Sequence, residues 1–400
     1  LIAPQNRKKY NIIVIGTGMY VSGRGTDGYG TVLPSIIEWK RNAGVIGKVT
    51  LVGVNGLHSR ETEMKATRLF QKTGVNLDLE VLPKGTNKDQ EAYKSVIKNV
   101  KQPACAIIVV PDHLHYCVAK DCINAGLNIL IVKPLAPTVE EGSDLIRLAR
   151  KKNIYGAVEF HKRWDEANLI MRDAVHSGKL GELLYLWVEY SQRKSIPTEI
   201  FKAWTEKTSI LQYLGVHYID IVRFITGATP IRVMAVGQKY WLPTKGLDAY
   251  DAIQCMIEWQ MPNGCKFNQT LLTNWIDPET SSAMSDQKIK MVGTAGRFES
   301  DQKERGIRIN LVGKGVEQPN PYYCKDYMNS DGKSEWRGYG VDSILTFLND
   351  VVDLGKQLTS VGELEKKRPS FTEALISTAV LEAAHKSLDK NSDWQMIEGL

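Results

Sequence analysis

The sequence predicts an α/β protein: a doubly wound parallel sheet comes first, and an α+β domain with an open, mainly antiparallel sheet follows. Three observations predict this. The apolar stretch 11–15 runs into a glycine-rich loop, near-continuous apolar strands then alternate with helices to about residue 160, and alternating strands joined by turns begin at residue 183. A length of 400 residues favours two domains, expected at 1–155 and 156–400, with the C-terminal helix free to pack back near the first domain.

In the first half, short apolar runs bounded by helix or turn signals are typical of strands that are buried on both faces. The second helix of the series is expected to begin with Ser59 as its N-cap and to end before Gly74. The expected strands cover 11–15, 49–55, 105–110, 128–132 and 156–160, and helices are expected at about 59–73, 115–126 and 138–151.

The second half changes to strands in which apolar and polar residues alternate, as in a sheet with one solvated face. A long apolar helix at 209–227 interrupts them and ends at Gly227, and the polar stretch 313–338 is expected to be loop. The expected strands cover 183–194, 232–242, 251–261, 265–276 and 289–300, after a helix near 165–178.

Composition excludes several classes of protein. The net charge of +6 is spread along the chain, and its short basic patches lack interleaved aromatics, so we expect no nucleic-acid partner. No stretch approaches the ~20 apolar residues of a membrane span. The six cysteines form no CxxC and no zinc spacing, so a reduced, cytoplasmic protein without a structural metal is expected.

The glycine loop "GTGMYVSGRGTDGYG" raises a choice between two kinds of phosphate-binding loop and a plain surface turn. A Walker-type loop ends in Lys-Ser or Lys-Thr, and none follows here. Gly16 and Gly18 instead stand where the dinucleotide fingerprint has its first two glycines, but Val21 stands where the third belongs. The alternating strands and helices that follow favour a dinucleotide-binding Rossmann domain over the turn.

Polar residues follow the strands of this half, at the sheet edge where such folds bind ligands. Helix caps, turns and salt bridges are the alternative explanation for each of them. Lys133-Pro134 is the sharpest case, because the lysine comes directly after five apolar residues. The other strand ends carry Asn55, Pro111, His113, His161, Lys162 and Arg163.

Several segments resemble the Gfo/Idh/MocA family of nicotinamide-dependent oxidoreductases, which act mostly on sugars, inositols and their derivatives. "IIVIGTG" looks like the family's opening strand and loop, "VVPDHLHYCVAKDCINAGLNILIVKP" is similar to its segment ending in Glu-Lys-Pro, and "GVHYIDIVRFITG" resembles its Gly-x-His-x-x-Asp helix. The resemblance spans nearly the whole chain. It departs at Val132, where the family has Glu, at Tyr213, where the family often has Asp, and in an insertion of roughly ten residues at 22–31.

The resemblance implies two catalytic residues. His217 would be the general acid or base for the hydroxyl proton, and Lys133 would hydrogen-bond the reacting oxygen. The two are expected to converge on one substrate oxygen. A half-buried structural histidine and a surface salt bridge are the alternatives.

The remaining candidate residues divide by ligand. For the cofactor, expected to be NAD with NADP left open, they are Gly16, Gly18, Met19, Asn55, Arg60, Pro111, His113, His115, Lys133 and Pro134. For the substrate they are Lys133, His161, Lys162, Arg163, Tyr213, His217, Asp220, Asn274 and Trp275. An ion pair is the alternative for Arg163, and core packing is the alternative for Tyr213 and Trp275.

The function expected from the resemblance is hydride transfer between a nicotinamide and a secondary alcohol or ketone of a sugar or sugar derivative. One alternative is a glycoside hydrolase or lyase that retains NAD and oxidises a sugar transiently. A non-catalytic dinucleotide sensor is less favoured, because both Lys133 and His217 are present. The resemblance also implies a homodimer or homotetramer. The apolar residues of strands such as "DAIQCMIEWQM" and "LLYLWVEY" predict that the exposed face of the second sheet mediates this association.

Overall fold

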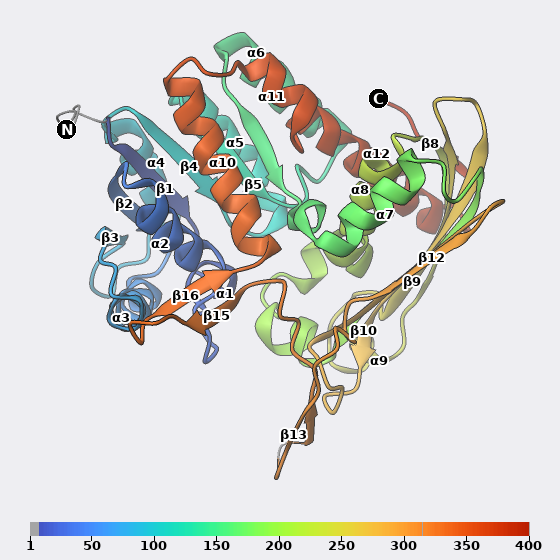
Figure 1. The fold of residues 1–400 in the computed structure, drawn as a ribbon, viewed down its shortest axis with the longest axis horizontal. Coiled ribbons are helices and arrows are strands. Elements are labelled where there is room, and N and C mark those ends of the chain that lie inside the picture. The colour runs from blue at the N-terminus through green and yellow to red at the C-terminus, as the bar shows by residue number, and fades with distance from the viewer. Residues whose placement is uncertain (1–7, 314, 400) are drawn as a thin grey trace. The chain divides into compact units, whose positions relative to one another are not determined.

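A computed structural model describes residues 8–313 and 315–399, and the chain forms two compact units (Figure 1). Unit 1 contains the chain up to Leu135 together with Glu141–His161 and Tyr322–Glu373. Unit 2 contains Ala136–Glu140, Lys162–Pro321 and the chain from Ala374 onward. The chain therefore leaves unit 1, builds most of unit 2 and returns, whereas two continuous domains were expected.

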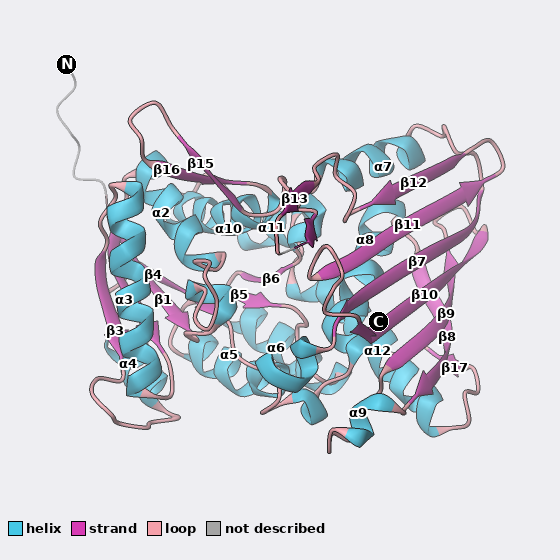
Figure 2. Ribbon diagram, turned by 90° about the horizontal axis from the view of Figure 1, so that it is seen from below, coloured by secondary structure: helices cyan, strands magenta, loops and turns pink. Residues whose placement is uncertain are grey.

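Unit 1 is built on a six-stranded parallel sheet of order β3-β2-β1-β4-β5-β6. Helices α2 and α10 lie on one face of this sheet and α5 and α6 on the other, as Figure 2 shows. The strands are β1 (Tyr10–Ile15), β2 (Ile46–Val52), β3 (Asp78–Leu82), β4 (Ala104–Ile108), β5 (Asn128–Val132) and β6 (Gly156–Glu159). The helices are α1 (Met19–Ser22), α2 (Val32–Ala43), α3 (Gly56–Thr73), α4 (Ala92–Asn99), α5 (His115–Asn124), α6 (Val139–Lys152), α10 (Tyr339–Gly355) and α11 (Val361–Lys367).

The doubly wound parallel sheet predicted from the sequence is confirmed. One helix start was wrong: Asn55, not Ser59, is the N-cap of α3, because its side-chain oxygen accepts a hydrogen bond from the backbone of Leu57 at 2.9 Å. Ser59 lies inside the helix, where its hydroxyl donates to the carbonyl of Leu82 at 2.8 Å. Gly74 ends the helix in the left-handed region at φ 71°, as expected.

Unit 2 is built on a seven-stranded sheet of order β12-β11-β7-β10-β9-β8-β17, in which β10 and β7 are parallel and the other pairs antiparallel. Helices α7 and α8 lie against one face (Figure 1). The strands are β7 (Leu183–Arg193), β8 (Thr229–Gln238), β9 (Ala252–Gln260), β10 (Lys266–Asp277), β11 (Ser285–Gly293), β12 (Arg297–Asp301), the hairpin strands β13 (Ile309–Leu311) and β14 (Gly315–Glu317), and β17 (Gln395–Met396). The helices are α7 (Glu166–His176), α8 (Val216–Thr226), α9 (Trp241–Thr244) and α12 (Phe371–Asp389), whose first turn belongs to unit 1.

The mainly antiparallel sheet was expected, and two local predictions need correction. The stretch 289–300 is a hairpin of β11 and β12, not a single strand. The helix expected at 209–227 begins as a wide π-turn over Leu211–Gly215 before α8, and it ends at Gly227 as predicted.

The prediction of loop for 313–338 was wrong. This stretch contributes β14 to unit 2 and forms the hairpin of β15 (Lys325–Met328) and β16 (Ser334–Arg337) in unit 1. Strands this short contain too few residues to show a clear alternation of apolar and polar side chains. One large aromatic residue anchors the hairpin. Trp336 is 6% exposed, belongs to the core of unit 1, and receives the edge-on ring of Tyr29.

Within residues 8–313 and 315–399, no helix is both long and apolar enough to cross a bilayer. The same residues bring together no group of three or more His, Cys, Asp or Glu that could hold a metal ion.

Replacing Trp336 by alanine should lower the free energy of unfolding by ~3–5 kcal/mol, because the core of unit 1 loses a large buried aromatic. Tyr327→Ala is the matched control, since Tyr327 lies in the same hairpin but is 44% exposed, and its effect should stay within about 0.5 kcal/mol. Denaturant unfolding measures both. Equal effects would contradict the assignment of this hairpin to the core.

Candidate active site

The glycine loop after β1 keeps its backbone free for two different reasons. Gly16 has φ 123°, and a Cβ there would lie 2.0 Å from the carbonyl oxygen of Val109, so the protein itself forbids a side chain. Gly18 has φ −79° and nothing within 4 Å of a Cβ position. No atom of the described residues requires a glycine at 18, and an open, bare backbone there fits the close approach of a pyrophosphate.

The insertion at 22–31 separates this loop from the main helix. Met19 opens α1, which ends at Gly23, and α2 begins only at Val32. Side chains of α3 hold the intervening loop: Lys65 donates to the carbonyl of Gly28 at 2.8 Å. The third glycine of the fingerprint is therefore displaced because the insertion adds the short helix α1 and a loop before α2. The turn between β1 and the first helix is still present.

The end of β2 is polar and basic. The side-chain oxygen of Asn55 caps the N-terminus of α3, and Arg60 is exposed on the same helix. Arg24 of the insertion donates from Nε to the carbonyl of Thr17 in the glycine loop at 3.0 Å. Partial burial, Arg24 and Lys88 together lower the pKa of His58.

His115 joins two strand ends. Its Nδ1 lies 2.7 Å from the carbonyl oxygen of Pro134, and its Nε2 lies 3.0 Å from that of Val110. Burial lowers the pKa of the imidazole. His115 therefore fixes the backbone after Lys133, while Pro111 and His113 begin the short turn that precedes α5.

Lys133 follows β5 directly, is 7% exposed, and precedes Pro134 through a cis peptide bond. Burial lowers the pKa of its ammonium to about 8, and Asp112 and Glu159 oppose that effect by raising it. A lysine of this kind donates hydrogen bonds while it is protonated and gives up a proton near neutral pH. Such a group suits the stabilisation of a developing alkoxide.

His161 follows β6 and lies in an aromatic cluster of unit 1. Its Nδ1 is 3.0 Å from a carboxylate oxygen of Glu159, and its ring lies 5.2 Å from that of Tyr323 and 5.7 Å from that of Tyr339. The sequence reasoning missed Glu159. The signal was available, since Glu159 is an acidic residue inside the apolar strand "GAVEF".

His217 lies on α8 of unit 2 and is 4% exposed, with the ring of Tyr190 at 6.3 Å. One turn further along the same helix, Asp220 accepts two hydrogen bonds from Arg163 at 2.9 and 2.6 Å. This buried ion pair is the alternative considered for Arg163, and it fixes α8 to the segment after β6. A substrate role for either residue stays a prediction.

Lys162 is enclosed within unit 2 and is 2% exposed. Its ammonium donates to the side-chain oxygens of Gln287 and of Gln302, the latter at 2.9 Å, and lies over the rings of Tyr190 and Tyr218. Burial lowers its pKa to about 7. These contacts place Lys162 in a structural network, and contact with substrate stays a prediction.

Tyr213 and Trp275 belong to one aromatic cluster, with ring centroids 6.1 Å apart. Trp275 is fully buried, and its indole nitrogen donates a hydrogen bond to the side-chain oxygen of Gln192 at 3.3 Å. This environment agrees with core packing, the alternative considered for Trp275. Tyr213 is half-buried and also meets the ring of Phe201 at 4.7 Å. Asn274, at the end of β10, accepts a hydrogen bond from the backbone of Ile276 at 3.1 Å.

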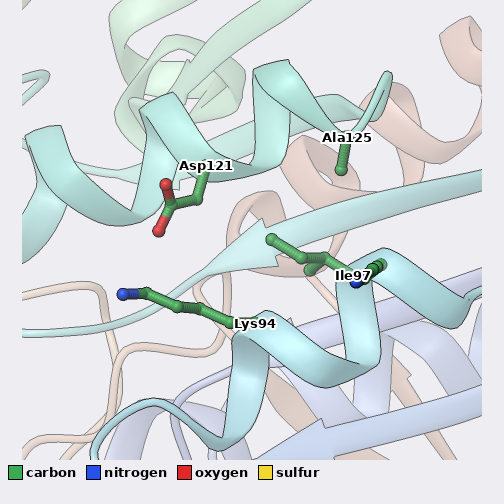
Figure 3. Close-up of a pocket in the computed structure, with 5 residues that line it drawn as sticks. Lys94, Ile97, Asp121 and Ala125 are labelled. Carbon is green, nitrogen blue, oxygen red and sulfur yellow. The ribbon is translucent and has the colours of Figure 1, made fainter.

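A hollow of about 360 Å³ lies between α4 and α5 and is shown in Figure 3. Its lining is Lys94, Ile97, Lys98, Asp121 and Ala125, and includes no residue predicted to bind cofactor or substrate. In Figure 3 the side chains of Lys94 and Asp121 extend toward each other from the two helices. On α5 the lining residues belong to the end of the helix, whereas ligands of such sheets bind at the carboxyl ends of the strands, near helix starts.

Comparison with known families decides the identity of the fold. Residues 48–160 match a family model described as the oxidoreductase family with an NAD-binding Rossmann fold, and residues 169–299 match the GFO/IDH/MocA C-terminal domain. The chain belongs to the Gfo/Idh/MocA oxidoreductase family. The resemblance drawn from the sequence motifs is thereby confirmed, and with it an NAD-binding Rossmann domain.

The chain matches less than half of the length of the two curated relatives described next. The chain is 31% identical over 156 residues to scyllo-inositol 2-dehydrogenase (NADP(+)) of Bacillus subtilis, covering 37% of this chain and 43% of that protein. It is 30% identical over 146 residues to UDP-N-acetylglucosamine 3-dehydrogenase of Acidithiobacillus ferrooxidans, covering 36% and 43%.

Solved structures share the whole fold at low identity. An inositol dehydrogenase homolog of Azotobacter vinelandii, complexed with NADH and myo-inositol, has a TM-score of 0.70 at 14% identity, over 97% of this chain and 98% of that one. A scyllo-inositol dehydrogenase of Lactobacillus casei, with bound NAD(H) and scyllo-inositol, has a TM-score of 0.67 at 14% identity, over 98% and 99%.

Gly18→Ala should weaken dinucleotide binding without unfolding the protein, because a Cβ there meets no protein atom but would meet a bound pyrophosphate. Calorimetric titration with NAD(H) and NADP(H) measures the affinity, and a thermal melt measures stability. Gly16→Ala is the comparison: it should lower the melting temperature, since its Cβ would collide with Val109. Unchanged affinity in Gly18→Ala would contradict the placement of the cofactor on this loop.

Proposed function

We propose that this protein is an NAD(P)-dependent oxidoreductase that interconverts a secondary alcohol and a ketone on a sugar or sugar derivative. The observation that carries the proposal is Lys133-Pro134 at the end of β5 together with His217 on α8, in a chain of this family. Its named relatives include inositol and UDP-sugar dehydrogenases, which supports an alcohol on a polyhydroxylated ring. Nothing in the site favours the hydrolase or the sensor.

The bare backbone at Gly16 and Gly18 would hold the dinucleotide, and the nicotinamide would supply the hydride acceptor or donor. Lys133 would donate a hydrogen bond to the reacting oxygen while its ammonium is charged. His217 would take the hydroxyl proton in the oxidising direction and return it in the reducing one. In this proposal the side chains of the protein therefore supply two things: His217 transfers the hydroxyl proton, and Lys133 donates a hydrogen bond to the reacting oxygen.

His217→Ala should lower kcat by ~10²–10⁴-fold, the usual contribution of a general acid or base, and Lys133→Ala should also lower kcat strongly. Dinucleotide affinity should change little in both, because neither residue holds the pyrophosphate. The substrate for the assay comes from a panel of inositols, free sugars and UDP-sugars, followed by the absorbance of reduced nicotinamide.

Lys94→Ala is the matched control for these variants, since Lys94 is an exposed lysine paired with Glu91 and lies outside the predicted site. Its kcat should equal that of the wild type. Wild-type turnover in His217→Ala or Lys133→Ala would refute that residue's catalytic role, and no turnover with any member of the panel would count against the substrate class.

We also infer a homo-oligomer formed through the face of the unit 2 sheet opposite α7 and α8. Tyr185, Val236 and Met256 on this face are 46%, 40% and 37% exposed, and Met256 pairs with Thr270 near the middle of the sheet. Exposed apolar side chains that share one face of a sheet are typical of interfaces between copies of a chain.

Light scattering at micromolar concentration should give a dimeric or tetrameric mass, and Met256→Glu should shift it toward the monomer by placing a charge in the interface. Met328→Glu is the control, because Met328 is 80% exposed in the β15–β16 hairpin of unit 1. A monomeric wild-type protein would rule this inference out.

A further inference from the structure

The end of β2 carries no acidic residue, since Gly53, Val54 and Asn55 follow the strand. In Rossmann domains the adenosine ribose of the dinucleotide lies at this strand end, where an Asp or Glu accepts a hydrogen bond from the 2′-hydroxyl. The side-chain oxygen of Asn55 accepts instead from the backbone of Leu57 at 2.9 Å. What Asn55 presents beyond this cap is its NH₂ group, which donates hydrogen bonds and accepts none.

We propose that this strand end binds the 2′-phosphate of NADP(H), and that Arg24 of the insertion is the residue that selects NADP(H) over NAD(H). Asn55 and Lys88 complete the site as a hydrogen-bond donor and a second cation. The inference rests on the proposed function, because it concerns the cofactor of that reaction. It adds which form of the dinucleotide the protein binds more tightly.

Two contacts place Arg24 at the end of β2. Its Nε donates to the backbone carbonyl of Thr17 in the glycine loop at 3.0 Å. Thr17 in turn lies against Gly53, because a Cβ at Gly53 would come 2.6 Å from the hydroxyl oxygen of Thr17. Arg24 therefore lies beside both the loop expected to hold the pyrophosphate and the strand end expected to hold the ribose.

Helix α3 holds the insertion around Arg24 in this place. The backbone N–H of the next residue, Gly25, donates to the carboxylate of Glu61 on α3 at 3.1 Å. Arg24 is half-buried, and within the described part of the chain neither of its Nη nitrogens has a hydrogen-bond or ion-pair partner. A guanidinium anchored through Nε keeps its two Nη groups for a phosphate, which arginine binds through two parallel hydrogen bonds.

Lys88 reaches the same strand end through an antiparallel β-bridge with Asn55. Two backbone hydrogen bonds between the flanking residues, of 2.8 and 3.0 Å, enclose this pair. Residues opposed in this way have Cα atoms about 4.5 Å apart and project their side chains to the same face. The ammonium of Lys88 and the amide of Asn55 therefore share one face, and the neighbouring carboxylate of Asp89 belongs to the other.

His58, in the first turn of α3, responds to both cations. Partial burial is the largest cause of its lowered pKa, Arg24 comes next, and Lys88 acts in the same direction. Glu61 opposes them by raising the pKa. Arg24 and Lys88 come from distant segments of the sequence, yet one imidazole at the end of β2 lies within the field of each.

The experiment titrates the full chain, freed of nucleotide, with NADPH, NADH, 2′,5′-ADP and 5′-AMP in a calorimeter. The last two differ only in the 2′-phosphate and lack the nicotinamide, so they test the strand end independently of hydride chemistry. NADPH should bind more tightly than NADH, and 2′,5′-ADP more tightly than 5′-AMP. Both ratios should be about 10- to 100-fold, the contribution of a hydrogen bond to a charged group.

Arg24→Ala should weaken the binding of NADPH and of 2′,5′-ADP by about 10- to 100-fold and leave the binding of NADH and 5′-AMP unchanged. Lys88→Ala should act in the same direction. Arg68→Ala is the matched control, because Arg68 is exposed on α3 about 18 Å along the helix from its first residue. It should change none of the four affinities.

Asn55→Asp separates the ligand role of this position from its structural one. Aspartate caps a helix as well as asparagine does, so the melting temperature should stay in place. The new carboxylate should repel the 2′-phosphate and accept from the 2′-hydroxyl, so NADPH binding weakens and NADH binding strengthens. A purely structural role of Asn55 would move neither affinity, and that result would overturn the placement of the ribose here.

Equal affinities of the wild-type protein for NADPH and NADH would overturn the proposal, and so would unchanged NADPH binding in Arg24→Ala. Should Arg24→Ala fail to fold, the ratio of 2′,5′-ADP to 5′-AMP binding in the wild type and in Lys88→Ala decides in its place. Binding of neither dinucleotide would refute the proposed function itself. Binding of both with equal affinity would refute only the selection of NADP(H).

Discussion

The parallel sheet of unit 1 places a buried ammonium, that of Lys133, directly after the end of a central strand. Removing Lys133 from water disfavours its charge, and burial alone would release the proton well below the usual pKa of a lysine. Asp112 and Glu159, at the ends of the two strands adjacent to β5, restore part of that charge. The parallel sheet makes this possible because it brings the carboxyl ends of its strands to one edge.

Two hydrogen bonds hold the ends of β5 and β6. His115 ties the turn before α5 to the carbonyl of Pro134, and Ser343 of α10 fixes Glu159. Helix α10 reaches Glu159 only because the chain returns from unit 2 to unit 1 at Tyr322. A segment more than 180 residues away in the sequence thus supports the edge of the first sheet.

In unit 2, two adjacent buried basic residues have different kinds of hydrogen-bond partner. Arg163, in the turn after β6, forms a two-bond ion pair with Asp220 of α8, one turn from His217. Lys162 has amide oxygens as its hydrogen-bond partners, and burial leaves its pKa at about 7. Breaking a buried ion pair by removing one partner is costly, because the other charge is left buried without compensation. Arg163 and Lys162 are adjacent in the sequence and looked alike there, yet their environments differ.

Sequence alone determined the parallel sheet, the mainly antiparallel second sheet, the glycine loop and the family motifs, because apolar periodicity and glycine placement are local properties. It did not determine that Asn55 caps α3, that Trp336 anchors a hairpin to the core of unit 1, or that Glu159 lies beside position 132. Those facts depend on strand register and on pairing between distant segments. Glu159, the carboxylate inside "GAVEF", lies opposite Val132 only because β6 pairs with β5 in this register. No local sequence pattern encodes which residue of the neighbouring strand lies opposite.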